Sequence, residues 1–151
     1  MEETFGDLPI QFSTGNHDIQ SNMEAVFDEN GWDGIWHYKS ETGDTYNNYH
    51  LQINGFDFIT LDYRNGSRYR QFLQDTLEEI KSRADYDDGK PIFIQIHSGV
   101  NGTTTGSYQD CGNTSTYLQG TLADWPQAIV MTAHSHYSSE VEDGIYQKNF
   151  T

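Results

Sequence analysis

The chain has 151 residues and a formal net charge of -15, which arises from 23 acidic and 8 basic side chains. This length predicts a single domain, and an aromatic content of 14% argues against disorder because it supplies bulk for a core. The acidic balance argues against nucleic acid and against an anionic membrane surface as partners. No run of 18 apolar residues occurs, so we expect no membrane span. The single cysteine, Cys111, excludes an internal disulfide and a multi-cysteine zinc cluster.

The cellular compartment follows less directly from the sequence. The first residues are acidic and lack the apolar segment of a signal peptide. Four N-glycosylation sequons begin at Asn65, Asn101, Asn113 and Asn149. They either indicate an exported protein, extracellular or in the cell envelope, or simply reflect a chain rich in Asn, Ser and Thr.

The first half of the chain predicts short strands and one short helix. Strands are expected over 9–13, 35–39, 48–53 and 56–62. The helix is expected over 21–29. Asn54-Gly55 separates the last two strands and is a strong signal for a hairpin.

The second half predicts alternating helices and buried strands. The strongest helical pattern covers 68–84, with Ser67 as its cap and an ion pair expected between Glu79 and Arg83. Its apolar stripe consists of Tyr69, Phe72, Leu73, Leu77, Ile80 and Ala84. Residues 91–96 are nearly all apolar, which is typical of a strand in the middle of a sheet. The remaining expected segments are a loop over 98–113, a helix over 114–125 and strands over 127–132 and 144–150.

Three polar clusters each follow a predicted strand. They are Asn16-His17, His97 and the pair His134 and His136. Ligands of open α/β sheets gather beyond the carboxyl ends of the strands, so we expect these clusters to converge at one edge. The other two histidines, His37 and His50, fall within strand patterns. His50 alternates with Asn48, Gln52 and Asn54 on a predicted solvent face, so we interpret both histidines as structural or surface residues.

The converging side chains suit a metal ion. Imidazole is the commonest neutral nitrogen ligand of transition metals. His134-Ser-His136 places two rings on the same side of an extended backbone, where they can reach one metal or two adjacent metals. Asn16 adds an oxygen ligand suited to a hard cation. A His-x-His pair alone is more often non-functional, so the three clusters together carry the prediction.

These residues resemble those of the calcineurin-like metallophosphoesterase family. Thr14-Gly-Asn-His-Asp18, a buried strand ending in His97, and Ala133-His-Ser-His136 match that family's later motifs in order, across nearly the whole chain. The resemblance implies an α/β (α+β) fold, as part of a four-layer αββα sandwich with mixed sheets. It also implies a hydrolase that cleaves a phosphate mono- or diester with a metal-activated hydroxide.

The resemblance also implies roles for particular residues. A centre of two metal ions, divalent or trivalent, would be bound by Asn16, His97 and His134 at the second metal and by His136 at the first. His17 would donate a proton to the leaving group or stabilise the transition state. Asp18 would orient His17 through a hydrogen bond, or cap the helix that follows. The sequence does not choose among Mn, Fe, Zn and Ni, and the partner it indicates is a small phosphate ester.

The chain departs from the family pattern at its start. The family's earlier Asp-x-His and Gly-Asp-x-x-Asp motifs are absent, and these would supply ligands of the first metal and a bridging carboxylate. We therefore expect residues 1–151 to form a single, truncated metallophosphoesterase domain. Because it lacks these motifs, we expect it to be inactive alone. The alternative is a non-catalytic metal-binding or interaction domain that retains part of the site. The substrate and the oligomeric state are left open.

Overall fold

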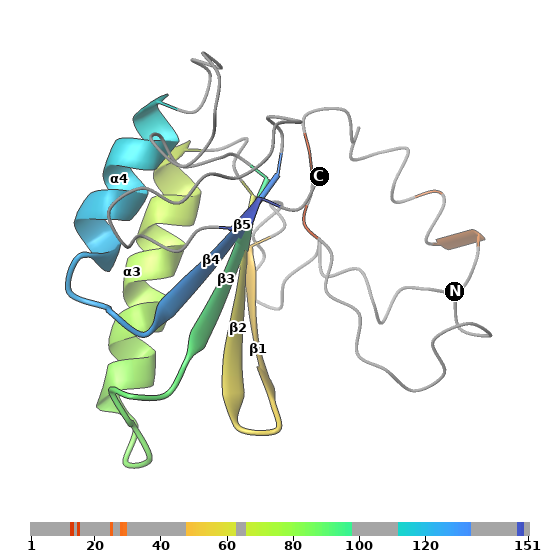
Figure 1. Ribbon diagram of the computed structural model, residues 1–151. Helices are drawn as coiled ribbons and strands as arrows, with labels where there is room; N and C mark the ends of the chain where they lie inside the picture. The colour runs from red at the N-terminus through yellow and green to blue at the C-terminus, as the bar shows by residue number, and fades with distance from the viewer. Residues whose placement is uncertain are drawn as a thin grey trace.

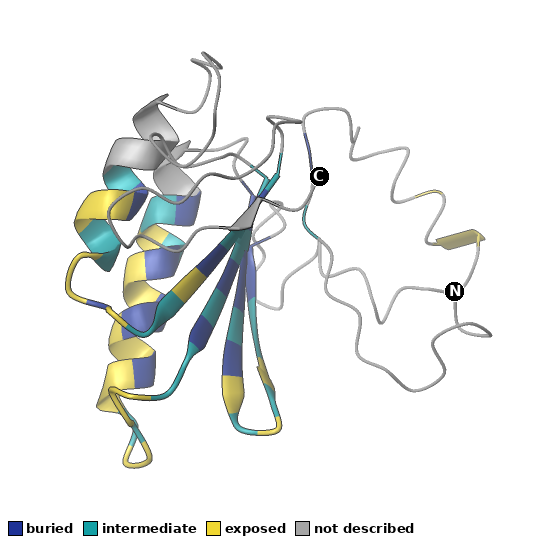
Figure 2. Cartoon of the chain, viewed as in Figure 1, coloured by how far each residue is buried: buried dark blue, intermediate teal, exposed yellow. Residues whose placement is uncertain are grey.

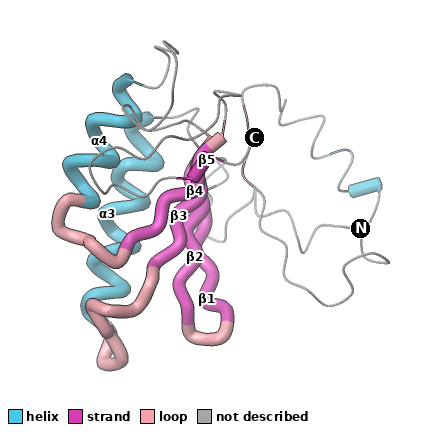
Figure 3. Tube along the Cα trace, viewed as in Figure 1, coloured by secondary structure: helices cyan, strands magenta, loops and turns pink. Residues whose placement is uncertain are grey.

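A mixed five-stranded sheet flanked by helices forms the fold, which belongs to the α/β class (Figures 1 and 3). The computed structural model describes residues 13, 15, 25, 28–29, 48–62, 66–97, 112–133 and 148–149. In chain order the elements are β1 (Tyr49–Ile53), β2 (Phe56–Leu61), α3 (Gly66–Ser82), β3 (Ile92–Ile96), α4 (Gly112–Leu122), β4 (Ala128–Thr132) and β5 (Lys148–Asn149). The spatial order of the strands is the same as their chain order.

The predicted hairpin joins β1 to β2. The two strands are antiparallel, with Tyr49 opposite Thr60 and Ile53 opposite Phe56. Asn54 and Gly55 have φ angles of 51° and 80°. Positive φ at both central residues is the requirement of the type I′ turn, whose twist matches that of the flanking strands. The Asn-Gly pair therefore fixes the register of this hairpin.

The rest of the sheet is parallel and is connected through helices. β2 pairs with β3, β3 with β4, and β4 with β5, all in parallel. Helix α3 connects β2 to β3 and α4 connects β3 to β4, and both helices lie on the same side of the sheet (Figure 1). Because the strands run in parallel, the carboxyl ends of β2, β3 and β4 meet at one edge.

The core lies between the sheet and the two helices. Alternate residues of β2, β3 and β4 are buried there against the apolar stripe of α3, and Figure 2 shows the buried residues on the side of α3 that faces the sheet. The core residues are Ile59, Leu61, Tyr69, Leu73, Leu77, Ile80, Ile92, Ile94, Ile96, Leu118, Trp125 and Val130. Burial of each large aliphatic side chain contributes about 1.5–3 kcal/mol.

Helix α3 differs at both ends from the helix predicted over 68–84. It begins at Gly66, so Ser67, the predicted cap, lies inside the helix. It ends at Ser82, which leaves Arg83 outside and Ala84 exposed. Arg83 pairs with the buried Asp57, whereas the sequence predicted a pair with Glu79, which is exposed. A buried carboxylate needs a cationic partner more than an exposed carboxylate does, because burial removes its hydration.

The other predicted elements agree to within a few residues wherever the structure describes them. Residues 25, 28 and 29 are helical, as expected for the helix over 21–29. Strand β5 covers only two of the residues in the predicted strand 144–150. Of the strand expected over 9–13, residues 9–12 lie outside the described residues and residue 13 is not in a strand. Residues 35–39 and residue 111 also lie outside the described residues. None of the described helices is long and apolar enough to cross a bilayer.

Candidate functional site

His97 marks the centre of the candidate site. It follows Ile96, the last residue of β3, so it lies at the carboxyl edge of the parallel strands. Ala133 follows β4 in the same way, and its backbone N–H donates to the carbonyl oxygen of His97 at 3.2 Å. This bond continues the β3–β4 ladder by one step beyond the register pair of Ile96 and Thr132. Ala133, the residue before His134 in the chain, therefore lies beside His97.

The backbone of Gly15 lies directly against the His97 ring. A Cβ atom built on Gly15 would lie 3.0 Å from Cε1, 3.1 Å from Nδ1 and 3.3 Å from Nε2 of His97. Gly15 is buried, and its neighbour in the chain is Asn16. A side chain on Gly15 would thus displace the imidazole, so the close approach depends on glycine.

The described residues hold only part of the predicted site. His97 is described and half-buried. The remaining predicted site residues lie outside the described residues, namely Asn16, His17, Asp18, His134 and His136. The structure brings His97 together with Gly15, which precedes Asn16, and with Ala133, which precedes His134. Among the described residues there is no group of three His, Cys, Asp or Glu that could hold a metal ion.

Two buried polar residues at the same edge were missed by sequence reasoning. Asp62 follows Leu61 at the end of β2 and is 0% exposed, and Asn48 precedes β1 and is 1% exposed. The backbone N–H of Asp62 donates to Oδ1 of Asn48 at 2.8 Å. The signal was present in the sequence, because an acidic residue at the carboxyl end of an apolar strand belongs to the same edge as His97. The solvent-face prediction for Asn48 was therefore wrong.

A second polar group lies at the opposite end of β2. Asp57 is 3% exposed, and its Oδ1 accepts hydrogen bonds from Nη1 of Arg83 at 2.9 Å and from Nε2 of His50 at 2.8 Å. Nη2 of Arg83 also contacts Oδ2 of Asp57. Burial raises the pKa of Asp57, but the hydrogen bonds from Arg83 and His50 outweigh it and hold this pKa below its ordinary value. His50, interpreted from the sequence as a structural or surface residue, is thus half-buried and bonded to Asp57.

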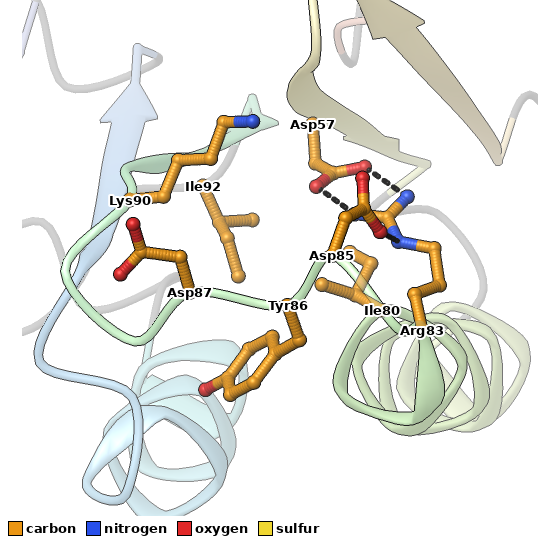
Figure 4. Close-up of a pocket in the computed structure, with 8 residues that line it drawn as sticks. All are labelled: Asp57, Ile80, Arg83, Asp85, Tyr86, Asp87, Lys90 and Ile92. Atoms are coloured by element: carbon orange, nitrogen blue, oxygen red, sulfur yellow. Dashed lines mark hydrogen bonds and ion pairs between the residues drawn. The ribbon is translucent and has the colours of Figure 1, made fainter.

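A small pocket opens beside this ion pair (Figure 4). It lies where α3 ends and β3 begins, and Asp57, Arg83, Tyr86, Lys90 and Ile92 contribute to its walls. The open space is about 10 Å³, which accommodates no more than one water molecule. The pocket is therefore too small for a phosphate ester, and it lies at the end of the sheet away from His97.

The chemistry available at the carboxyl edge fits a metal ion. His97 supplies an imidazole that is still partly open to solvent, and the buried Asp62 supplies a carboxylate on the neighbouring strand. Nitrogen and oxygen donors of this kind suit Zn, Mn, Fe or Ni. Comparisons of the chain with family models, with curated proteins and with solved structures give no match.

Proposed function

We propose that this chain is the metal-binding part of a calcineurin-like metallophosphoesterase that hydrolyses a phosphate mono- or diester. The observation that carries the proposal is the contact between Gly15 and the His97 ring, together with the bond from Ala133 to His97. Three segments far apart in the sequence meet there, and each carries one of the family-like motifs. Such convergence is expected of a binding edge and is not required for the core.

The proposal assigns the ligands by resemblance. The metal ligands are Asn16, His97, His134 and His136. Bound metal ions supply Lewis acidity and lower the pKa of a coordinated water, and they offset the negative charge of the phosphate ester. This local field explains how a chain with a net charge of -15 would accept an anionic substrate.

His17 and Asp18 are the residues proposed to protonate the leaving group. His17 holds a proton on its ring and gives it to the departing oxygen of the ester, which avoids release of an alkoxide. Asp18, one residue further along the chain, fixes the tautomer and orientation of that ring. The proton ends on the alcohol product, and His17 recovers a proton from solvent before the next turnover.

We further infer that the sheet is half of a four-layer sandwich. The face of the sheet away from α3 and α4 is apolar at the end far from His97, where the ring centroids of Phe58 and Phe93 stack at 4.9 Å and Phe56 and Ile129 are about two-fifths exposed. No helix or strand of the described ranges covers this face. Exposed apolar faces of this kind are stabilised by packing against a second sheet. An experimental structure in which a helix covers this face would contradict the sandwich.

Hydrolysis assays on the full-length protein test the proposed activity. The substrates are p-nitrophenyl phosphate and its bis-ester, with added Mn²⁺. We expect His17→Ala to lower kcat by about 10²–10⁴-fold, the range for loss of a general acid, and His97→Ala to abolish the response to Mn²⁺. His50→Ala is the matched control, because this histidine binds Asp57 at the far end of the sheet, and it leaves both readouts unchanged.

The outcomes separate the two functions considered. An unchanged rate in His17→Ala would remove His17 from the mechanism. Binding of Mn²⁺ without hydrolysis of either ester would contradict the enzyme and favour a non-catalytic metal-binding domain.

A further inference from the structure

The proposed ligand set has a deficit of negative charge. Asn16, His97 and His134 are all neutral donors, and neutral ligands hold a divalent or trivalent cation less firmly than a set that includes carboxylates. Within the part of the chain whose burial is described, the buried acidic residues are Asp57 and Asp62. Their positions decide which of them can serve the site.

The register of the sheet places Asp62 beside His97. Leu61 of β2 pairs with Ile96 of β3, so Asp62 and His97 occupy the next position on two adjacent parallel strands. Neighbouring strands are separated by about 4.8 Å. Asp57 lies five residues earlier on the same strand, about 16 Å away at 3.3 Å per residue, and is engaged by Arg83 and His50.

Asn48 holds the end of β2 in place and leaves a hydrogen-bond donor unused. Of the two polar atoms in the Asn48 side chain, only Oδ1 can accept a hydrogen bond from the backbone N–H of Asp62. This bond therefore fixes the orientation of the Asn48 side-chain amide. Nδ2 of Asn48 is then buried and has no hydrogen-bond partner among the described residues. A buried donor left unpaired costs free energy and is uncommon in folded proteins. Its presence at the end of β2 fits an edge that is completed by a group from outside the chain.

We infer that Asp62 is a positioning residue of the metal site, whose carboxylate supplies the negative charge that the neutral ligands lack. This inference rests on the proposed function, because it assumes that His97 binds a metal ion. Asp62 acts from the strand next to His97, and Asn48 fixes the backbone from which it extends. Carboxylates just outside the ligand set typically change metal affinity by about 10–100-fold when they are removed.

Equilibrium dialysis with Mn²⁺ tests the inference on the full-length protein. The comparison includes wild type, Asp62→Asn, Asp57→Asn and His97→Ala, with thermal unfolding of each variant followed by circular dichroism. Asp57→Asn is the matched control, because it removes one buried carboxylate from the same strand and changes the net charge equally. We expect Kd for Mn²⁺ to rise about 10–100-fold in Asp62→Asn and to stay within about twofold of wild type in Asp57→Asn.

A second measurement needs no variant. Mn²⁺ broadens the NMR signals of nearby nuclei, so we expect it to erase the backbone amide signals of Asp62 and His97 in the wild-type protein. The amide signals of Asp57 and Arg83, at the far end of the sheet, should be broadened much less. Even where Asp62→Asn does not fold, a sharp Asp62 signal in the presence of bound Mn²⁺ would overturn the inference.

The results distinguish failure of this inference from failure of the proposed function. If His97→Ala loses Mn²⁺ but Asp62→Asn binds it like wild type, the role of Asp62 is wrong and the proposed function stands. A sharp Asp62 signal in the presence of bound Mn²⁺ has the same meaning. If wild type and His97→Ala bind Mn²⁺ equally, or if wild type does not bind it, both the function and the inference are overturned.

Discussion

Replacement of Gly15 by alanine offers a direct test of how the site is built. The added Cβ would lie 3.0 Å from Cε1 of His97, which is about 0.4 Å closer than the 3.4 Å at which ordinary contact begins. The imidazole or the Gly15 backbone must therefore move by a few tenths of an ångström. Overpacking of this kind costs about 1–3 kcal/mol. A displacement of 1 Å can lower activity on the order of 100-fold, so for this smaller shift we expect Mn²⁺ affinity to fall by about tenfold.

The control for this variant is Gly120→Ala. Gly120 lies in α4, and apart from its chain neighbours and the helix's own backbone, nothing lies within 4 Å of the Cβ that alanine would add. Alanine is about 1 kcal/mol more favourable than glycine inside a helix, so Gly120→Ala should raise Tm and leave metal binding unchanged. Thermal unfolding and equilibrium dialysis with Mn²⁺ measure both effects. If Gly15→Ala binds Mn²⁺ as tightly as wild type, the contact with His97 does not position a ligand.

Three further expectations concern the stability of the fold. Because the folded-state pKa of Asp57 lies below its ordinary value of 3.8, its contribution is present above about pH 4 and is lost as the pH falls through that lowered pKa. Urea unfolding should therefore show Asp57→Asn less stable than wild type by about 1.5–3 kcal/mol at pH 7, and a difference that stays constant down to pH 2 would contradict this. Tyr117→Phe loses the hydrogen bond from its hydroxyl to the Arg70 carbonyl, at 2.7 Å, and should cost about 1 kcal/mol. Tyr69→Phe removes a buried hydroxyl that has no hydrogen-bond partner in the described part of the chain, and it should be neutral or stabilising in the same assay. An equal loss in both variants would refute the comparison. Leu77→Ala, in the core between α3 and the sheet, should cost about 2–5 kcal/mol, and a loss below 1 kcal/mol would show that the site collapses around the cavity.

The regular elements were predictable because local patterns determine them. Asn54-Gly55 specifies its own turn, and the apolar run before His97 can only be a buried strand. The ion pair between Asp57 and Arg83 was not predictable, because it joins residues 26 positions apart and depends on where α3 ends. Sequence spacing favoured a local partner, Glu79, for Arg83, whereas the fold provides a buried one.

The candidate site likewise combines features that local sequence determines with features that only tertiary contacts determine. The strand ends told which residues belong to the carboxyl edge, since parallel strands align their ends. The positions of the strand ends do not determine which strands are neighbours in the sheet. The register of β2 against β3 is needed to place Asp62 beside His97, and the packing of Gly15 on that histidine comes from tertiary contacts alone. The local sequence shows that Asp62 follows an apolar strand, but it does not show that this strand lies beside the one that ends at His97.

The connection of β2, β3 and β4 through helices has a consequence for the order of folding. Each parallel pair forms only after a crossover helix has closed a loop of many residues, and such non-local pairing is slow compared with the formation of the β1–β2 hairpin. The edge that holds His97 therefore becomes complete only after the whole sheet has assembled. Hairpin and helix signals would appear early in refolding, while the proposed metal affinity would be acquired only at the last step.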